Sequence, residues 1–199
     1  MKPENIHCLA FNFPGVSVET TDEKPLYFIK SSISYSKSGT VIKKPEGDSR
    51  FWTEVELGIF INEDCENIPE NDAKKYIYGF CVSGDLTCDN IYNRDHHLAY
   101  SKSRENFCPC SDIIKTDIND FNLRMNTYIN GIETQSGNLQ DMIYSPYKSI
   151  SYISSITKLK KNDLIILGTP PGWNNNFLHS GDEIVQTIES IGSLHYRII

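Results

Sequence analysis

The sequence predicts a strand-dominated α+β fold with few short helices. Short apolar runs rich in β-branched and aromatic residues recur along the chain and alternate with polar stretches rich in turn residues, which is typical of strands. Apolar residues at helical spacing are scarce. The 199 residues suit one sizeable domain and no linker divides them, so we expect a single domain over residues 1–199.

The expected elements follow one another along the whole chain. Strands are predicted from the apolar runs at residues 26–29, 55–61, 76–82, 164–167, 184–188 and 194–199. The clearest helix start is at Pro69, where Pro-Glu-Asn-Asp-Ala is typical of a first turn, and this helix is expected over residues 69–78. A second candidate helix covers residues 141–155.

Composition excludes several classes of partner. The formal net charge is −7 and no cluster of lysine or arginine interrupts it, which argues against binding to nucleic acid. No apolar run approaches the roughly 20 residues of a membrane span, and the first five residues lack the apolar core of a signal peptide. We therefore expect a cytoplasmic protein with a small-molecule partner and no membrane association. An anionic ligand would need a metal ion or a few lysines to receive it.

The six cysteines are irregularly spaced, and only Cys108 and Cys110 form a close pair. A CxC pair without further ligands nearby is a poor start for a zinc site. We expect reduced thiols, most of them buried.

Two glutamates share one face of the strand that we expect over residues 54–61. Because residues i and i+2 of a strand point the same way, Glu54 and Glu56 project together, about 7 Å apart along the chain. They repel each other unless a cation lies between them, and carboxylate oxygens suit Mg²⁺, Mn²⁺ or Ca²⁺. The alternative is an ordinary solvent-exposed strand face, which this pattern alone favours. Asp85 follows another expected strand, where we expect the chain to leave the sheet, and by itself it fits a turn residue.

Several motifs occur in a fixed order over almost the whole chain. The most specific are Glu54-Val55-Glu56-Leu57-Gly58, Ile129-Asn130-Gly131 and Ile166-Leu167-Gly168-Thr169-Pro170. Together they resemble the fumarylacetoacetate hydrolase family, and most closely its short single-domain members that act on acylpyruvates and oxaloacetate. The resemblance implies a mixed β-sandwich or roll like the C-terminal domain of that family, and usually a homodimer.

The resemblance also implies roles for individual residues. The family carboxylates that hold Mg²⁺ match Glu54, Glu56 and Asp85. The metal would act as a Lewis acid on a 2-oxo acid, whose adjacent carboxylate and keto oxygens can both coordinate it, and would stabilise the enolate that forms.

Cationic and hydroxyl groups complete the expected site. Lys102 matches the family lysine and would neutralise the substrate carboxylate or the enolate; its alternative is a solvated surface lysine. Gly168 and Thr169 match the substrate-binding turn, where Thr169 offers a hydroxyl and a backbone N–H to a carboxylate; a plain turn residue is the alternative. Lys30 ends an expected strand and lies either near the site or packed at the strand end.

The match fails at two places. Family hydrolases carry a His-x-x-Glu pair on a lid, which activates water. Here Glu19 falls at the glutamate position, but Val16 occupies the histidine position. The family arginine that helps to bind the substrate carboxylate is replaced by Asp89. Nearby candidates to replace these groups are Arg94 and the pair His96-His97, and a flexible polar loop explains the two histidines at least as well.

Two functions from different classes stay open. One is a Mg²⁺-dependent enzyme acting on small 2-oxo or β-diketo acids, by acylpyruvate C–C hydrolysis or by decarboxylation or tautomerisation of oxaloacetate. Hydrolysis needs an activated water, so Val16 moves the expectation toward lyase or isomerase chemistry, with Glu19 and Lys102 as the catalytic residues. The other is a catalytically degenerate metal-binding homologue that serves as a binding protein or regulatory subunit.

Overall fold

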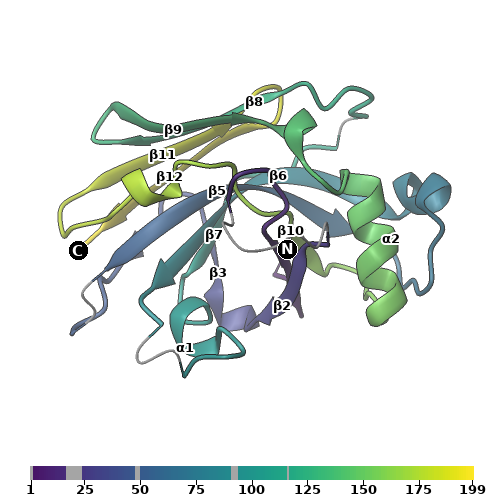
Figure 1. The fold of residues 1–199 in the computed structure, drawn as a ribbon, viewed down its shortest axis with the longest axis horizontal. Helices are drawn as coiled ribbons and strands as arrows, with labels where there is room; N and C mark the ends of the chain where they lie inside the picture. The colour runs from purple at the N-terminus through teal and green to yellow at the C-terminus, as the bar shows by residue number, and fades with distance from the viewer. Residues whose placement is uncertain (1, 17–23, 48–49, 91–93, 116) are drawn as a thin grey trace.

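The computed structural model describes residues 2–16, 24–47, 50–90, 94–115 and 117–199, whose strands form two sheets (Figure 1). The first sheet has the strand order β2 (Leu26–Lys30), β1 (Ile6–Ala10), β10 (Leu164–Ile166), β5 (Phe51–Ile61), β6 (Ile77–Cys88), β7 (Cys108–Cys110) and β3 (Tyr35–Lys37). The second has the order β4 (Val41–Ile42), β12 (Gly192–Ile198), β11 (Glu183–Ile188), β8 (Arg124–Ile129) and β9 (Ile132–Asn138). The predicted strand-dominated α+β class is confirmed.

Helices in the described part of the chain are short. They are the α-helices α1 (Ala99–Lys102) and α2 (Pro146–Ile156) and the 3₁₀ helices η1 (Ser32–Ser34), η2 (Glu70–Tyr76), η4 (Leu139–Asp141) and η5 (Trp173–Asn175). Ser145 caps α2 by accepting a 3.1 Å hydrogen bond from the N–H of Lys148, and Pro146 at the start of the helix has no N–H that would need a partner. The helix expected over residues 69–78 is the shorter 3₁₀ helix η2, because residues 77 and 78 already belong to β6.

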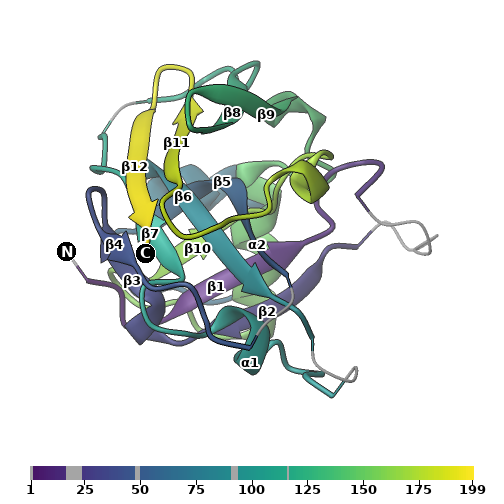
Figure 2. The same ribbon diagram turned by 90° about the vertical axis from the view of Figure 1, so that its left-hand side faces the viewer.

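β5 and β6 form the centre of the molecule. They pair antiparallel along nearly their whole lengths, and in both ribbon views they lie between the second sheet and strands β1 and β2 (Figures 1 and 2). Side chains alternate between the two faces of a strand. Val55, Leu57 and Ile59 therefore point toward the second sheet, in one buried apolar cluster with Leu194 and Ile184.

The opposite face of β5 and β6 carries a smaller apolar cluster and the polar groups described below. Phe28 on the edge strand β2 and Cys108 on β7 belong to the same cluster as Phe60 of β5. The first sheet must therefore curl, since strands from its two ends meet around one set of side chains. Such a curled sheet agrees with the expected mixed sandwich or roll.

The six cysteines are all free and buried, as predicted. Cys108 and Cys110 lie on β7, where each sulfur is 3.4 Å from the hydroxyl of Ser83. Burial raises the pKa of the Cys8 thiol well above its ordinary value, and for Cys110 burial is again the largest cause of a raised pKa. These groups are therefore uncharged packing residues.

A buried carboxylate fastens the first strand. Asp163 precedes β10 and accepts hydrogen bonds from the backbone and side-chain nitrogens of Asn5 (both 3.0 Å), from Nε2 of His7 (3.1 Å) and from the N–H of Lys160 (2.8 Å). Burial by itself raises the pKa of Asp163, but the hydrogen bonds from His7, Lys160 and Asn5 together lower it below its usual value. These contacts thus fix the parallel strands β1 and β10 to each other at the end where both strands begin.

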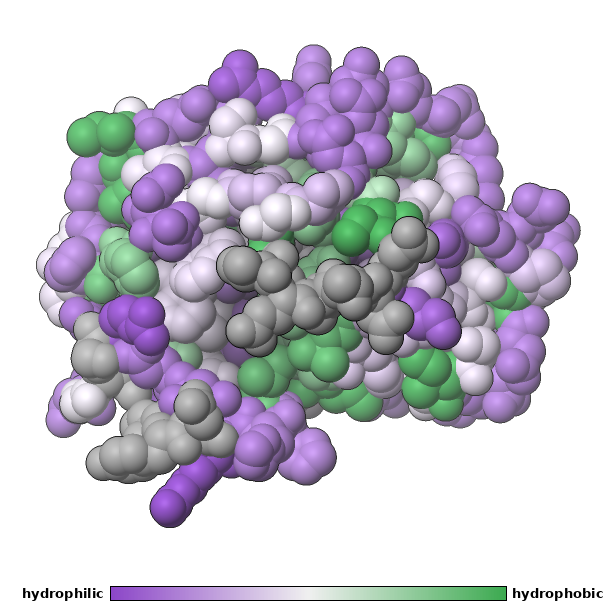
Figure 3. Space-filling view, in the orientation of Figure 1, coloured by the Kyte–Doolittle hydropathy of each residue, from purple (hydrophilic) through white to green (hydrophobic). Residues whose placement is uncertain are grey.

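Hydrophilic side chains cover most of the face seen in Figure 3, while hydrophobic side chains gather toward its middle. None of the helices in the described ranges is long and apolar enough to cross a membrane.

Candidate metal and substrate site

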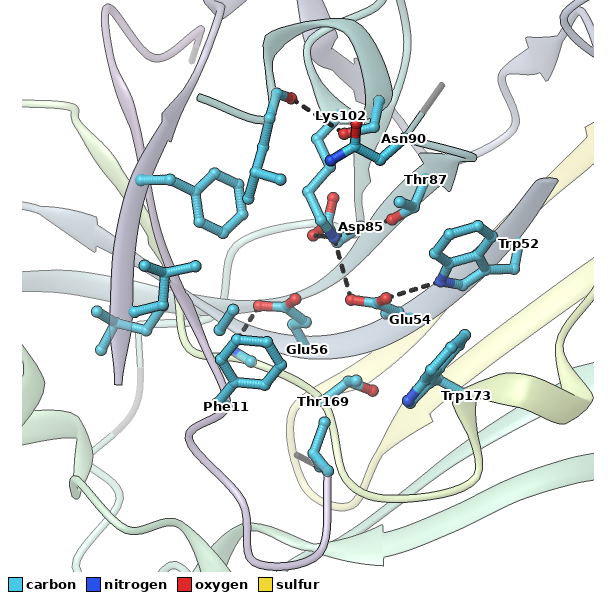
Figure 4. Close-up of a pocket in the computed structure, with 18 of the residues that line it drawn as sticks. Phe11, Trp52, Glu54, Glu56, Asp85, Thr87, Asn90, Lys102, Thr169 and Trp173 are labelled. Carbon is cyan, nitrogen blue, oxygen red and sulfur yellow. Dashed lines mark hydrogen bonds and ion pairs between the residues drawn. The ribbon is translucent and has the colours of Figure 1, made fainter. Parts of the chain in front are cut away.

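Three carboxylates share one face of the β5–β6 ladder. Glu54 and Asp85 are directly opposite each other in the antiparallel register, and Glu56 is the next residue on that face of β5. One carboxylate oxygen of each lies within 4.8 Å of the others. All three side chains point into one cavity (Figure 4). Like charges directly opposite in a sheet are destabilising, so this arrangement needs a positive partner.

Asp85 is within a strand and not at a turn, which corrects our expectation that the chain leaves the sheet there. The strand continues to Cys88, and its polar and apolar residues alternate: Ser83, Asp85 and Thr87 face the cavity side while Leu86 is buried on the other. This alternation is visible in the sequence, and it predicts a strand that continues past Asp85.

Burial dominates the electrostatics of the carboxylates. Glu56 is only 2% exposed and Asp85 only 1%. Burial raises the pKa of Glu56 well above its ordinary value, and the charges of Asp85 and Glu54 raise it further. Burial likewise raises the pKa of Glu54 against the attraction of Lys102. The protein's own cations therefore do not fully compensate these two carboxylates.

Two buried lysines converge on the third carboxylate. Lys102 Nζ lies 2.5 Å from Asp85 Oδ2, 2.8 Å from Thr87 Oγ1 and 3.2 Å from Glu54 Oε2. Lys30 Nζ contacts the other oxygen of Asp85 and donates to the carbonyl of Phe107 at 2.7 Å. Burial is the largest single influence on the pKa of Asp85 and raises it. The charges and hydrogen bonds of Lys102 and Lys30 together outweigh burial and bring the pKa below its usual value.

Lys102 is a fixed cation of the site. The residue is only 7% exposed, so the alternative of a solvated surface lysine is wrong. Burial alone lowers the pKa of Lys102, but the charges of Asp85 and Glu54 outweigh it and raise the pKa above its ordinary value. Lys102 therefore stays protonated and serves to attract anionic oxygens, not to accept a proton. Lys30 likewise lies in the site and is not merely packed at a strand end.

The loop before Lys102 is organised by Asp95. This carboxylate accepts hydrogen bonds from the N–H of Tyr100 (3.1 Å) and from the N–H and hydroxyl of Ser101 (2.6 Å each), which starts α1 and turns Lys102 toward the cavity. His96 and His97 are exposed and do not line the cavity, which favours the polar-loop alternative for them.

The Gly168-Thr169 turn closes another side of the site. Gly168 has φ +85°, and a Cβ there would lie 2.9 Å from the carbonyl of Leu9, so glycine is required. Its N–H donates to Glu56 Oε2 at 2.6 Å. Thr169 is 5% exposed and lines the cavity. The turn thus both orients a carboxylate and presents a hydroxyl.

Gln135, which the sequence did not single out, orients that hydroxyl. Its Nε2 donates to Thr169 Oγ1 (3.0 Å) and to the carbonyl of Pro170 (2.7 Å), while its Oε1 accepts from Asn176 Nδ2 (2.7 Å) and Thr127 Oγ1 (3.2 Å). Because Pro170 can only accept, the amide orientation is fixed. The hydroxyl hydrogen of Thr169 is then free to donate into the cavity.

The departures from the family pattern have different structural outcomes. Val16 lines the cavity. Glu19 lies outside the described residues. Asp89 follows β6 and does not line the cavity. Its carboxylate accepts hydrogen bonds from Arg50, from the guanidinium Nε at 2.6 Å and from the backbone N–H at 2.9 Å.

The cavity has a volume of about 260 Å³, and two tryptophans missed by sequence reasoning line it. Trp52 Nε1 donates to Glu54 Oε1 at 2.8 Å, and the Trp52 and Trp173 rings are 5.4 Å apart (Figure 4). Trp52 is two residues before Glu54, so the same strand periodicity could have placed it on this face. Trp173 follows an irregular turn and carries no such signal.

Comparisons with known proteins place this geometry in a family. Oxaloacetate tautomerase YisK of Bacillus subtilis is 30% identical over 209 residues, which cover 98% of this chain and 69% of that protein. The crystal structure of a 2-hydroxyhepta-2,4-diene-1,7-dioate isomerase from Mycobacterium marinum has a TM-score of 0.90 at 26% identity, covering 100% of this chain and 75% of that one. The crystal structure of fumarylpyruvate hydrolase from Pseudomonas aeruginosa in complex with Mn²⁺ and pyruvate shares the fold, with a TM-score of 0.90 at 19% identity over 99% of this chain and 90% of that one. A family model described as fumarylacetoacetate (FAA) hydrolase C-terminal matches residues 6–199. The chain therefore belongs to the fumarylacetoacetate hydrolase family.

Proposed function

We propose that the protein is a divalent-metal-dependent enzyme that acts on small, enolisable 2-oxo acids. The observation that carries this proposal is the cluster of Glu54, Glu56 and Asp85, buried on the wall of a cavity that also receives Lys102. If all groups are ionised, three carboxylates and the two ammonium groups of Lys102 and Lys30 leave one net negative charge.

The donor set fits a hard divalent cation. Three carboxylate oxygens are close enough together to share one ion, and oxygen ligands of this kind suit Mg²⁺, with Mn²⁺ and Ca²⁺ as the alternatives. The raised pKa values of Glu54 and Glu56 indicate that positive charge is in deficit beside them. Mn²⁺ and pyruvate in the Pseudomonas aeruginosa fumarylpyruvate hydrolase agree with this choice of ion and ligand.

The chain's own residues would bind the substrate and hold its charge. A bound Mg²⁺ would supply Lewis-acid polarisation of the carboxylate and keto oxygens of a 2-oxo acid. Lys102 would attract the substrate carboxylate or the negative charge that develops on the enol oxygen. Thr169 would donate its hydroxyl, oriented by Gln135, to the substrate carboxylate. The apolar cavity walls would exclude water from these contacts.

Keto–enol tautomerisation is the reaction that this set of residues supports best. It requires only that a proton leave the carbon next to the keto group and that a proton be added to the enol oxygen, whereas C–C hydrolysis also needs an activated water. Val16 stands where family hydrolases have histidine, and no described residue of the cavity wall is a histidine. Glu19 is our candidate for the proton carrier, and the name of the Bacillus subtilis relative supports the reaction class. Decarboxylation of oxaloacetate also passes through an enolate, that of pyruvate, with release of CO₂, and stays a second outcome.

A non-catalytic role is the competing proposal, and Val16 is the observation that favours it. In that case the protein would hold the metal and an enolate-like anion without turning a substrate over, as a binding protein or regulatory subunit. A single-domain organisation, a homodimer and a cytoplasmic location also stay predictions.

The test is metal-dependent turnover. Protein stripped of metal should regain, on addition of Mg²⁺, the ability to interconvert the keto and enol forms of a 2-oxo acid such as an acylpyruvate, followed by ultraviolet absorbance. Glu56→Gln should lose this activity. Asp89→Asn changes a carboxylate to an amide in the same way, but directly after β6 and outside the cavity lining, and it should keep the activity. Equal activity in Glu56→Gln would refute the proposal, and Mg²⁺-dependent binding of oxalate without any turnover would favour the non-catalytic role.

A further inference from the structure

The cavity has a polar floor and an apolar, aromatic wall. We propose that this wall receives an uncharged apolar or aromatic group on the substrate, so that the preferred 2-oxo acid carries no second carboxylate. This inference rests on the proposed function, because the 2-oxo acid group must occupy the carboxylate end of the cavity.

The aromatic wall begins directly beside the proposed metal ligands. Trp52 is anchored by its indole N–H to Glu54 and lies at a 35° tilt to Trp173, with the ring centroids 5.4 Å apart. Phe177 packs edge-on against Trp52 at 6.3 Å from behind. In Figure 4 the two indoles lie together on one side of the carboxylates, and Phe11 lies on the other. Flat, fixed rings of this kind favour contact with an apolar or aromatic group.

Apolar side chains continue around the rest of the cavity. They include Phe11, Val16, Leu26 and Phe28. A cavity of about 150 Å³ can hold benzene, so the 260 Å³ here has room for a 2-oxo acid group together with a short aliphatic chain or one ring.

A second carboxylate would have no cation to meet. Lys102 is the one lysine or arginine among the described residues that line the cavity, and Asp85 and Glu54 already engage it. By sequence, residues 17–23 and 91–93 contain no lysine, arginine or histidine, and residues 17–23 contain three acidic residues. A carboxylate buried against the aromatic wall would therefore lose its hydration without compensation.

The replacement of the family arginine agrees with this charge pattern. Asp89 stands at that position, and its carboxylate is bound to Arg50 outside the cavity. The chain thus lacks a cationic group at the position where the family pattern places one for a carboxylate.

The chain itself contains a reporter for this wall. Its two tryptophans are the only ones in the sequence, and both line the cavity. Intrinsic tryptophan fluorescence therefore measures ligand binding next to the wall without depending on turnover. The probes are three 2-oxo acids, each titrated with saturating Mg²⁺: pyruvate as the common head group, phenylglyoxylate with a neutral ring, and 2-oxoglutarate with a second carboxylate.

The inference predicts that phenylglyoxylate binds at least tenfold more tightly than pyruvate and that 2-oxoglutarate binds no more tightly than pyruvate. Tighter binding of 2-oxoglutarate than of phenylglyoxylate would overturn it. Pyruvate binding without discrimination among the acids would overturn this inference alone and leave the proposed function standing. Binding of phenylglyoxylate that needs no metal, with no turnover of any acid, would support the aromatic wall and contradict the metal-dependent function.

Variants at Trp173 separate the wall from the fold. Trp173→Ala should reduce the preference for phenylglyoxylate over pyruvate about tenfold, while Trp52 still reports binding. Trp173→Lys should reverse the preference by giving 2-oxoglutarate a cation. Ile132→Ala, at a residue that is 69% exposed and does not line the cavity, is the control and should change neither ratio. An unchanged preference in both Trp173 variants, with thermal unfolding like that of the control, would refute the role of the wall.

Discussion

Replacing Glu56 with glutamine should make the metal-free protein no less stable while removing most of its stabilisation by Mg²⁺. In the metal-free state Glu56 is a buried carboxylate beside two others, and its pKa is raised by burial and by the charges of Asp85 and Glu54. Its charge therefore opposes folding near neutral pH. Glutamine has the same shape, and its carbonyl oxygen can still accept the 2.6 Å hydrogen bond from the N–H of Gly168, so the substitution removes the charge and keeps the contact.

The magnitude follows from ligand linkage. A metal ion present at about 100 times its dissociation constant stabilises the folded state by about 2.7 kcal/mol. For a chain of this length each kcal/mol corresponds to about 2–4 °C in Tm. The wild-type protein should therefore gain about 5–10 °C on addition of Mg²⁺, and Glu56→Gln should gain a small fraction of that.

Thermal unfolding followed by circular dichroism, with EDTA and with Mg²⁺, measures both quantities. Glu133→Gln is a matched control, because Glu133 is a glutamate on β9 that pairs with Arg124 and does not line the cavity; its response to Mg²⁺ should equal that of the wild type. The reasoning is wrong if Glu56→Gln unfolds several degrees below the wild type in EDTA, or if Mg²⁺ raises its Tm as much as that of the wild type.

Three further substitutions test other parts of the site and fold. Gln135→Met should lower kcat/KM by about tenfold, as measured by steady-state kinetics, because Thr169 loses its orienting donor, and urea unfolding should show a loss of about 2–4 kcal/mol from the polar groups left unpaired. Asp163→Asn should lower the free energy of unfolding by about 2 kcal/mol at neutral pH. It should also make stability depend less on pH in the acid range, because the pKa of Asp163 is depressed in the folded state. The stabilisation by Asp163 is present above the unfolded-state pKa of about 3.9 and is lost as the pH falls through the folded-state pKa. Lys30→Met should cost about 3–5 kcal/mol in urea unfolding because it leaves Asp85 buried with one fewer cation.

Each of these substitutions has a contrasting outcome. An unchanged KM and kcat in Gln135→Met would show that the orientation of Thr169 does not matter for turnover. Asp64→Asn is the control for Asp163, because Asp64 is exposed and pairs with Lys160 on the same turn; its stability loss should be smaller. A stable Lys30→Met protein would show that Lys102 alone balances Asp85.

The strands of the site were largely predictable, because periodicity is a local property. The short apolar run at residues 55–61 predicted β5, and the i, i+2 rule predicted the common face of its two glutamates; the structure places both glutamates on the cavity wall. The end of β6 was missed at Asp85, since an aspartate beside glycine also fits a turn. Its polar–apolar alternation continues to Cys88 and was the better signal.

What brings the site together could not be derived from local pattern. The pairing of Glu54 with Asp85 is a matter of strand register, and the position of Lys102 depends on Asp95 holding the loop before α1. Only the ordered resemblance to a family indicated these residues in advance. Trp173, which lines the cavity, and Gln135, which contacts Thr169 from behind the cavity lining, were missed because tertiary contacts that no sequence spacing reports bring them to the site.

The central claim is that Glu54, Glu56 and Asp85 together hold one divalent cation. Its most direct test is a crystal of the protein grown with Mn²⁺ and measured at a wavelength where manganese scatters anomalously. We predict one strong anomalous peak among the three carboxylates, bonded to an oxygen of each, and its absence in crystals of Glu56→Gln. A peak elsewhere, or no peak between these carboxylates at millimolar Mn²⁺, would contradict the account.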